Sequence, residues 1–253
     1  MDGGPGEKQL IAVKAMGTPP ADLLCSESRK DHMRLLSCLG MACNICGDLW
    51  QFTDYIERAG ISIHQYLLAG RVPLVFCTGT VAEAERNMPE IERILAGRSL
   101  KYILISHNES DEDGALGLFH EKFPEASVVC SAMTARELKG YGYEGNVIAA
   151  APGLPLEAEG VSIQFVAYPS EVHMNDGLLF FEEHTRIFYS SDLFFSTGNT
   201  AGKVRKVSWD DAINDFGEAR IPEPRRNALK ASLKSVSPLF VAAGHGVCLD
   251  CSN

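Results

Sequence analysis

One short loop in the middle of the chain gathers an imidazole and four carboxylates. The loop lies in the segment ILISHNESDEDGAL, and it carries the side chains of His107, Glu109, Asp111, Glu112 and Asp113. So many acidic groups in one loop repel one another, and without a cation some of them would take up protons at neutral pH. A divalent metal ion removes that repulsion. Because His-x-Glu-x-Asp offers both nitrogen and oxygen ligands, the pattern favours iron, manganese or zinc over calcium or magnesium.

Three further candidate ligands follow apolar segments elsewhere in the chain. His173 follows VSIQFVAYPSEV, Asp192 follows RIFYSS, and His245 follows PLFVAAG. In layered α/β proteins the carboxyl ends of the strands face the functional crevice, so residues that are distant in the sequence can meet there. We therefore expect these three side chains and the acidic loop to converge on one metal site.

The acidic loop has two other possible interpretations besides a metal site. Glu109, Asp111, Asp113 and Gly114 match four positions of an EF-hand loop, but His120 stands where that loop needs a bidentate Glu. A solvated acidic turn is the second alternative. The remaining histidines lack acidic neighbours in a suitable pattern, and we predict that they are surface or packing residues, namely His32, His64, His120 and His184.

Cysteine pairs are a second feature with metal chemistry. Cys43 and Cys46 form one Cys-x-x-Cys pair, and Cys248 and Cys251 form another. In a chain without an export signal, thiols or metal ligands are favoured over disulfides. If the fold united the two pairs, they would hold a single iron ion, an iron–sulfur cluster or a structural zinc ion. The alternative is two unrelated pairs of reduced thiols.

Composition limits the class of protein and of partner. The chain has 253 residues, of which 45% are hydrophobic, so it can bury a sizeable core. A net charge of -10 without a Lys/Arg-rich run argues against nucleic acid or an anionic membrane as the main partner. No apolar run reaches the roughly 18 residues that span a bilayer, and MDGGPGEKQL lacks the layout of an export signal. We expect a cytoplasmic protein.

The order of predicted elements indicates an α/β layered sandwich. Residues 1–50 read as an N-terminal extension that carries the first cysteine pair, and residues 51–253 read as the main domain, which ends in the second pair. Strands are predicted at 62–68, 73–77, 101–106, 127–130, 147–151, 161–168, 177–183, 186–191 and 238–244. Helices are predicted at 82–97, 115–123, 134–140, 208–219 and 222–235.

Taken together, these motifs resemble the metallo-β-lactamase-fold domain of flavodiiron proteins and of the related stand-alone oxygen-binding diiron proteins. The resemblance covers about residues 55 to 247, and it extends to the segments SIHQYLL, PLVFCTGT and VHMNDGLLFF. Its specificity comes from Glu109, because hydrolytic relatives carry a His there. The resemblance implies an αββα sandwich with two non-haem iron ions. In that arrangement, one iron is bound by His107, Glu109 and His173, the other by Asp111 and His245, and Asp192 bridges them.

The resemblance also implies a function, with alternatives that the sequence leaves open. A diiron protein of this kind binds dioxygen or nitric oxide and either reduces it, as an oxidoreductase, or senses dioxygen. The chain shows neither a flavodoxin-like FMN domain nor a Gly-rich phosphate loop, so a reductase would need an external electron-transfer protein. A sensor would need a signalling partner. A homodimer is left open. The alternative enzyme is a zinc-dependent hydrolase of the same fold, which Glu109 opposes.

One ligand position departs from the family pattern. The family usually has a His directly after the loop's Asp, and this chain has Glu112 there. Either Glu112 ligates the second iron through oxygen, Asp113 takes that place, or the second iron lacks one ligand. A second departure is Cys77, which stands before the Thr-Gly turn where relatives often have Asp.

Overall fold

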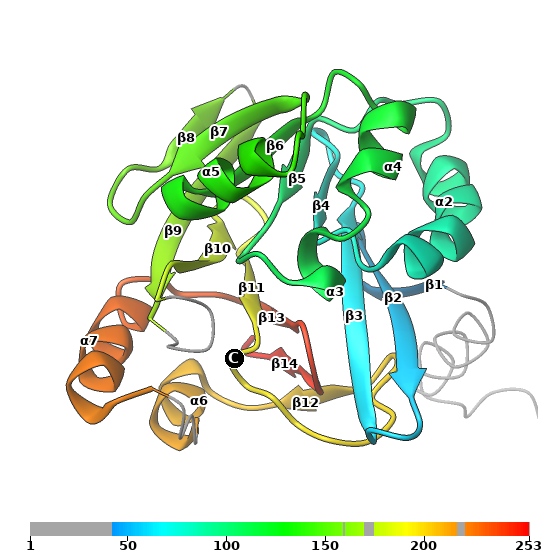
Figure 1. Cartoon of the computed structure of the whole chain (residues 1–253). Helices are drawn as coiled ribbons and strands as arrows, with labels where there is room; N and C mark the ends of the chain where they lie inside the picture. Colours follow the sequence, from blue (N-terminus) through cyan, green and yellow to red (C-terminus); the bar gives the residue numbers. More distant parts are fainter. Residues whose placement is uncertain (1–41, 159, 170–174, 217–220, 253) are drawn as a thin grey trace, which may run out of the picture.

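Two seven-stranded sheets pack face to face, and helices cover the outer face of each (Figure 1). This computed structural model describes residues 42–158, 160–169, 175–216 and 221–252. The layers follow the order helix, sheet, sheet, helix. The α/β layered sandwich predicted from the sequence is therefore the observed architecture.

The first sheet changes from antiparallel to parallel pairing at its fourth strand. Its strands follow their order along the chain, namely β1 (Ala42–Cys46), β2 (Leu49–Ile56), β3 (Ile61–Leu68), β4 (Leu74–Phe76), β5 (Tyr102–Leu104), β6 (Ser127–Ser131) and β7 (Asn146–Ala150). Parallel strands need long crossover connections, which are usually helical. Helices accordingly separate β4, β5, β6 and β7 along the chain.

The second sheet is formed by the later strands and has a mixed order. From one edge to the other it contains β12 (Val204–Lys206), β14 (Cys248–Asp250), β13 (Phe240–Ala243), β11 (Ile187–Ser191), β10 (Gly177–Glu182), β9 (Val161–Tyr168) and β8 (Leu156–Ala158). The neighbours β11 and β13 are parallel. Both strands therefore end at the same edge of the sheet.

Three buried apolar clusters hold the four layers together. Phe76, Phe180 and Tyr189 belong to the cluster between the sheets. The other two clusters lie between each sheet and its helices. The helices of the described chain are α2 (Val81–Leu95), α3 (Ser110–Asp113), α4 (Leu116–Lys122), α5 (Ala132–Gly140), α6 (Trp209–Asp215) and α7 (Glu223–Leu233). No helix among these is long and apolar enough to cross a membrane.

The sheets begin earlier and end later in the chain than the sequence predicted. Residues 42–50, which we assigned to the extension, form β1 and the start of β2, joined by a turn in which Gly47 has a φ of +53°. The segment ACNIC has no apolar alternation, so its pairing with β2 could not be read from the pattern. At the other end, β14 follows the predicted last strand. Residues 1–41 of the predicted extension, and residues 217–220 of the predicted helix 208–219, lie outside the described residues.

Candidate metal centre

Strand ends bring the candidate ligands to one place. β5 leads into His107, β11 into Asp192 and β13 into His245. These are the strand ends at which the sequence predicted a metal site. His173 follows β9, but it lies outside the described residues, so its role as a ligand stays a prediction.

His107, Glu109 and Asp192 form a first group of ligand atoms. One ligand atom from each residue lies within 4.8 Å of the other two. The His107 Nε2 atom is 3.1 Å from Glu109 Oε2. His107 is buried, whereas half of the Glu109 side chain is exposed. This first group therefore has a protein-enclosed side and a side open to solvent.

Asp111, Asp192 and His245 form a second group. The His245 Nε2 atom is 3.3 Å from Asp111 Oδ2 and 3.3 Å from Asp192 Oδ1. The Nδ1 atom of His245 lies 3.0 Å from the backbone oxygen of Ser62. Because a carbonyl can only accept, Nδ1 carries the hydrogen and Nε2 is the nitrogen that faces the carboxylates. Asp192 belongs to both groups, which is the placement expected of a bridging carboxylate.

One of the two carboxylate oxygens of Glu112 is buried without a hydrogen-bond partner among the described residues. The residue is 3% exposed, and its Oε1 atom accepts a hydrogen bond of 2.8 Å from the Tyr189 hydroxyl. Its Oε2 atom is buried and has no hydrogen-bond partner among the described residues. Burying a carboxylate oxygen without a partner is costly, and a metal ion would satisfy it. The residues present therefore fit a metal ion at this point.

The chain around Glu112 is held by backbone contacts. The Glu112 N–H donates to the Glu109 carbonyl at 2.9 Å, which makes the single turn of α3. The Glu112 carbonyl in turn accepts from the N–H and the hydroxyl of Thr78, at 2.7 and 3.1 Å. A Cβ atom at Gly114 would lie 2.3 Å from the Ser110 carbonyl, so the exit from this turn requires glycine. The Thr-Gly turn after β4 thus fixes the acidic loop.

Electrostatics in the site reflect an excess of negative charge. Burial on its own lowers the pKa of both imidazoles, but hydrogen bonds to neighbouring carboxylates raise the pKa of His107 to about 9 and that of His245 to about 11. Burial raises the pKa of Glu112. Burial and the charge of Glu112 raise the pKa of Asp113 to about 7. Bound protons therefore offset the charge in the metal-free site, and a metal ion would displace them.

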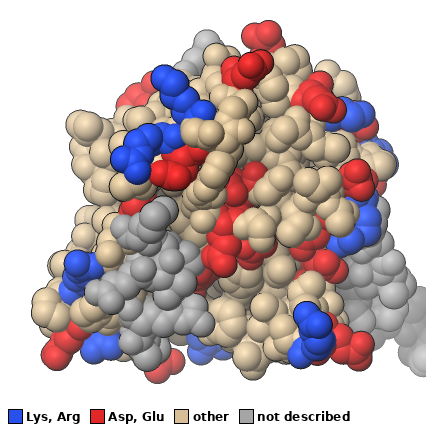
Figure 2. All heavy atoms as spheres, in the orientation of Figure 1, with Lys and Arg blue, Asp and Glu red and all other residues tan. Residues whose placement is uncertain are grey.

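Acidic side chains also gather near the centre of the face shown in Figure 2. Asp113 lies in the same helical turn as Glu112, and its Oδ2 atom is likewise buried without a hydrogen-bond partner among the described residues. The alternative in which Asp113 replaces the family's His therefore stays open beside Glu112.

The two cysteine pairs do not form one group in this structure. Cys43 is disulfide-bonded, so it could bind a metal only after reduction. The Cys248 thiol lies in the cluster between the sheets, whereas Cys251 packs in the cluster beneath α6 and α7. The expectation that cysteines are reduced is wrong for Cys43, and the additional iron, iron–sulfur or zinc site remains a hypothesis about Cys43, Cys46, Cys248 and Cys251.

Several residues that support the site were missed by sequence reasoning. Ser106 contacts the His107 imidazole, Ser191 and Tyr189 contact the Glu112 carboxylate, and Ser62 fixes the His245 tautomer. Ser106 and Ser191 each directly precede a candidate ligand. That adjacency was the available signal, although a single serine at a strand end has many other uses.

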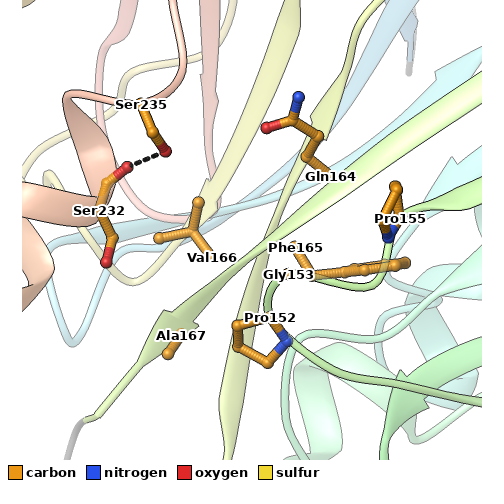
Figure 3. Close-up of a pocket in the computed structure, with 9 residues that line it drawn as sticks. All are labelled: Pro152, Gly153, Pro155, Gln164, Phe165, Val166, Ala167, Ser232 and Ser235. Carbon is orange, nitrogen blue, oxygen red and sulfur yellow. Dashed lines mark hydrogen bonds between the residues drawn. The ribbon is translucent and has the colours of Figure 1, made fainter.

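A cavity of about 380 Å³ lies away from the candidate ligands, between β9 and α7. Figure 3 shows its lining, which includes Pro152, Gln164 and Ser232. The described lining residues carry no ionisable side chain. The cavity is therefore separate in chemistry from the metal centre.

Comparison with known proteins agrees with this architecture. Anaerobic nitric oxide reductase flavorubredoxin of Vibrio vulnificus is 23% identical over 145 residues, which cover 56% of this chain and 29% of that protein. The flavodiiron protein of Giardia intestinalis superposes with a TM-score of 0.65 at 18% identity, over 83% of this chain and 55% of that one. A metal-soaked flavodiiron core from Synechocystis gives a TM-score of 0.67 at 18% identity, over 83% of this chain and 57% of that one.

These likenesses confirm the predicted fold, a metallo-β-lactamase-type αββα sandwich, and the resemblance to the flavodiiron core. The chain spans about a third of the length of the curated relatives it matches. The family model of the ODP family beta lactamases matches residues 61–239, which is well over half of the chain. This protein therefore belongs to the ODP family of β-lactamase-fold proteins.

Proposed function

We propose that this protein is a non-haem diiron protein that binds dioxygen or nitric oxide. The observation that carries the proposal is the pair of ligand groups that share Asp192. A bridging carboxylate can hold two metal ions about 3.5–4 Å apart, which is close enough for a small gas molecule to bind between them. The family resemblance at Glu109 favours iron over zinc. A relative from Vibrio vulnificus, named a nitric oxide reductase, supports the choice of substrates.

The residues divide between the two ions. His107 and Glu109 would hold the first iron, together with His173. Asp111 and His245 would hold the second, with Glu112 in place of the family's His. Asp192 would bridge them.

When bound, a pair of ferrous ions supplies one electron from each ion to the gas. The protein's own residues provide the surroundings for that chemistry. The Ser62 carbonyl keeps the Nδ1 hydrogen of His245 in place, so that Nε2 faces the site. The Phe195 ring lies beside that imidazole, with 5.8 Å between the ring centroids and 50° between the ring planes. The carboxylates compensate the charge of the ions.

Reduction and sensing make different demands on partners. Reduction of dioxygen to water needs more electrons than two iron ions hold, so a reductase would receive electrons from an external electron-transfer protein. A sensor would bind gas without sustained turnover and would pass a change of surface to a signalling partner. Cytoplasmic location and a homodimer remain predictions.

Metal identity tests the proposal. Protein purified without oxygen should contain iron, and its visible absorption should change when dioxygen or nitric oxide is added. Colourless protein that contains zinc would contradict the proposal and would support the zinc-dependent hydrolase. Gas consumption with a supplied reductant then separates the two modes, because a reductase consumes gas continuously and a sensor stops after one equivalent.

A further inference from the structure

A buried chain of hydroxyl groups connects the two proposed metal positions. The Ser106 hydroxyl is 2.7 Å from His107 Nδ1 and 2.8 Å from the hydroxyl of Ser191. The Ser191 hydroxyl is 3.4 Å from Glu112 Oε1. Ser106 and Ser191 are both fully buried. These hydroxyl groups therefore link the His107 imidazole of the first ligand group to the Glu112 carboxylate, which is proposed to bind the second iron.

Tyr189 supplies the last hydroxyl group of this hydrogen-bonded series, at its Glu112 end. Its hydroxyl donates to the same Glu112 Oε1 atom at 2.8 Å. The ring is held rigidly, because it stacks on Phe76 with 5.2 Å between centroids and on Phe180 with 6.2 Å between centroids. A donor on a ring locked in the core between the sheets presents its hydrogen at a fixed point.

The direction of each hydrogen bond follows from the chemistry of the groups. The Nε2 atom of His107 faces Glu109 and the proposed iron, so Nδ1 carries the imidazole hydrogen and donates to Ser106. Ser106 then has its own hydrogen for Ser191. Ser191 in turn has a hydrogen for Glu112 Oε1. All the protein donors that reach this carboxylate within the described residues end on Oε1, and Oε2 is left without one.

We infer that Ser106, Ser191 and Tyr189 are positioning residues that orient His107 and Glu112 as one unit and leave Oε2 as the single ligand atom of Glu112. The inference rests on the proposed diiron function. Groups that hold a metal ligand typically change metal affinity by about 10–100-fold when they are removed. The Ser191 hydroxyl lies 3.4 Å from both His107 Nδ1 and Glu112 Oε1, and Ser106 contacts His107 directly and Glu112 through Ser191. Because Tyr189 contacts only Glu112 of these two ligands, the serine variants and the tyrosine variant should differ.

Cobalt(II) provides the test, because it binds such sites without redox chemistry and its visible absorption reports the ligand number. The metal-free 253-residue chain is titrated with cobalt(II) as wild type, Ser106→Ala, Ser191→Ala and Tyr189→Phe. Wild type should bind two ions. The two serine variants should weaken both binding steps by about 10–100-fold, and Tyr189→Phe should weaken one step by a similar factor. The absorption of the affected ion should change as well.

Two neighbouring residues provide matched controls. Ser190 is as buried as Ser191, but its hydroxyl donates to the Leu193 carbonyl at 3.0 Å. Tyr66 packs against Tyr189, but its hydroxyl donates to the Ala243 carbonyl at 2.6 Å. Ser190→Ala and Tyr66→Phe should leave both binding steps and the cobalt spectrum unchanged.

The outcomes separate this inference from the function on which it rests. If Ser106→Ala and Ser191→Ala bind two cobalt ions as tightly as Ser190→Ala does, the inference is wrong and the diiron proposal stands. Two serine variants and one tyrosine variant keep the test available if one of them does not fold. If wild type binds fewer than two cobalt ions, the diiron proposal itself is overturned.

Discussion

At the scale of single residues, Glu112 distinguishes this chain from the family pattern. A buried carboxylate with one oxygen bound by Tyr189 and one without a partner is suited to bind a metal through a single atom. Replacing Glu112 by Ala should lower the iron content by about one ion per chain, because the second iron loses an oxygen ligand. Metal analysis of protein purified without oxygen measures this loss. Asp113→Ala, from the same turn, is the control, and metal loss there instead would assign the ligand to Asp113.

His64 lies outside the two ligand groups, and its protonation should affect the folding stability of the protein. It is buried, and its Nε2 atom is 3.0 Å from the Gly246 carbonyl, beside the loop that carries His245. Burial lowers the pKa of His64 from 6.5 to about 4. The unfolded chain therefore takes up a proton near pH 6.5 and the folded chain near pH 4, so folding stability falls as the pH is lowered between these values.

This shift in the pKa of His64 should change the free energy of unfolding by on the order of 3 kcal/mol. Urea unfolding of metal-free protein between pH 7 and pH 4 measures it. The wild type should lose more stability than His64→Gln over this interval, because the variant has no imidazole to protonate. Equal losses in the two proteins would show that His64 is not responsible.

How much of the site could be predicted from the sequence depends on the types of residue that form it. Imidazoles and clustered carboxylates after apolar segments have few structural uses, and the structure brings His107, Glu109, Asp111, Asp192 and His245 together. Serine residues gave no comparable indication of a functional site, because serine is common in turns, in helix caps and in protein cores. Their role depends on which strand lies beside which, and only the packing of the two sheets shows that Ser106 meets Ser191.

At the scale of elements, the single turn of α3 places three acids of the loop. Its exit depends on Gly114, where a Cβ atom would come within 2.3 Å of a backbone oxygen. Gly114→Ala should therefore destabilise the protein by about 1–3 kcal/mol and reduce its metal content. Gly117→Ala in α4 is the control, because nothing lies within 4 Å of its Cβ position, and it should be neutral or slightly stabilising. Similar unfolding curves and metal contents for the two variants would contradict this role of α3.

Most elements were predictable because their apolar periods are long or clearly bounded. The helix over α2 has a capping box at its start, formed by Thr80 and Glu83, and the strands of the core are continuous apolar runs. Elements such as β1, β12 and β14 were missed because three to five residues carry too little pattern, and the eight-residue strand β2 was missed as well. Their existence depends on neighbouring strands rather than on local sequence.

At the scale of the whole molecule, a net charge of -10 coincides with an acidic centre at the ends of strands from both sheets. Bound cations should stabilise this fold, because they offset the repulsion among carboxylates that folding brings together. Removing metal with a chelator should lower the thermal midpoint, and a metal present at 100 times its Kd contributes about 2.7 kcal/mol. Calorimetry before and after chelation measures the difference. An unchanged midpoint would mean that the folded protein binds no metal more tightly than the unfolded chain does.

In the proposed site, two metal ions share Asp192. Iron per chain, measured in anaerobically purified wild type, His245→Ala and Asp192→Ala, tests it most directly. We expect about two ions in the wild type, about one in His245→Ala and the lowest content in Asp192→Ala, because a bridging ligand serves both ions. Retention of two iron ions by Asp192→Ala would contradict it.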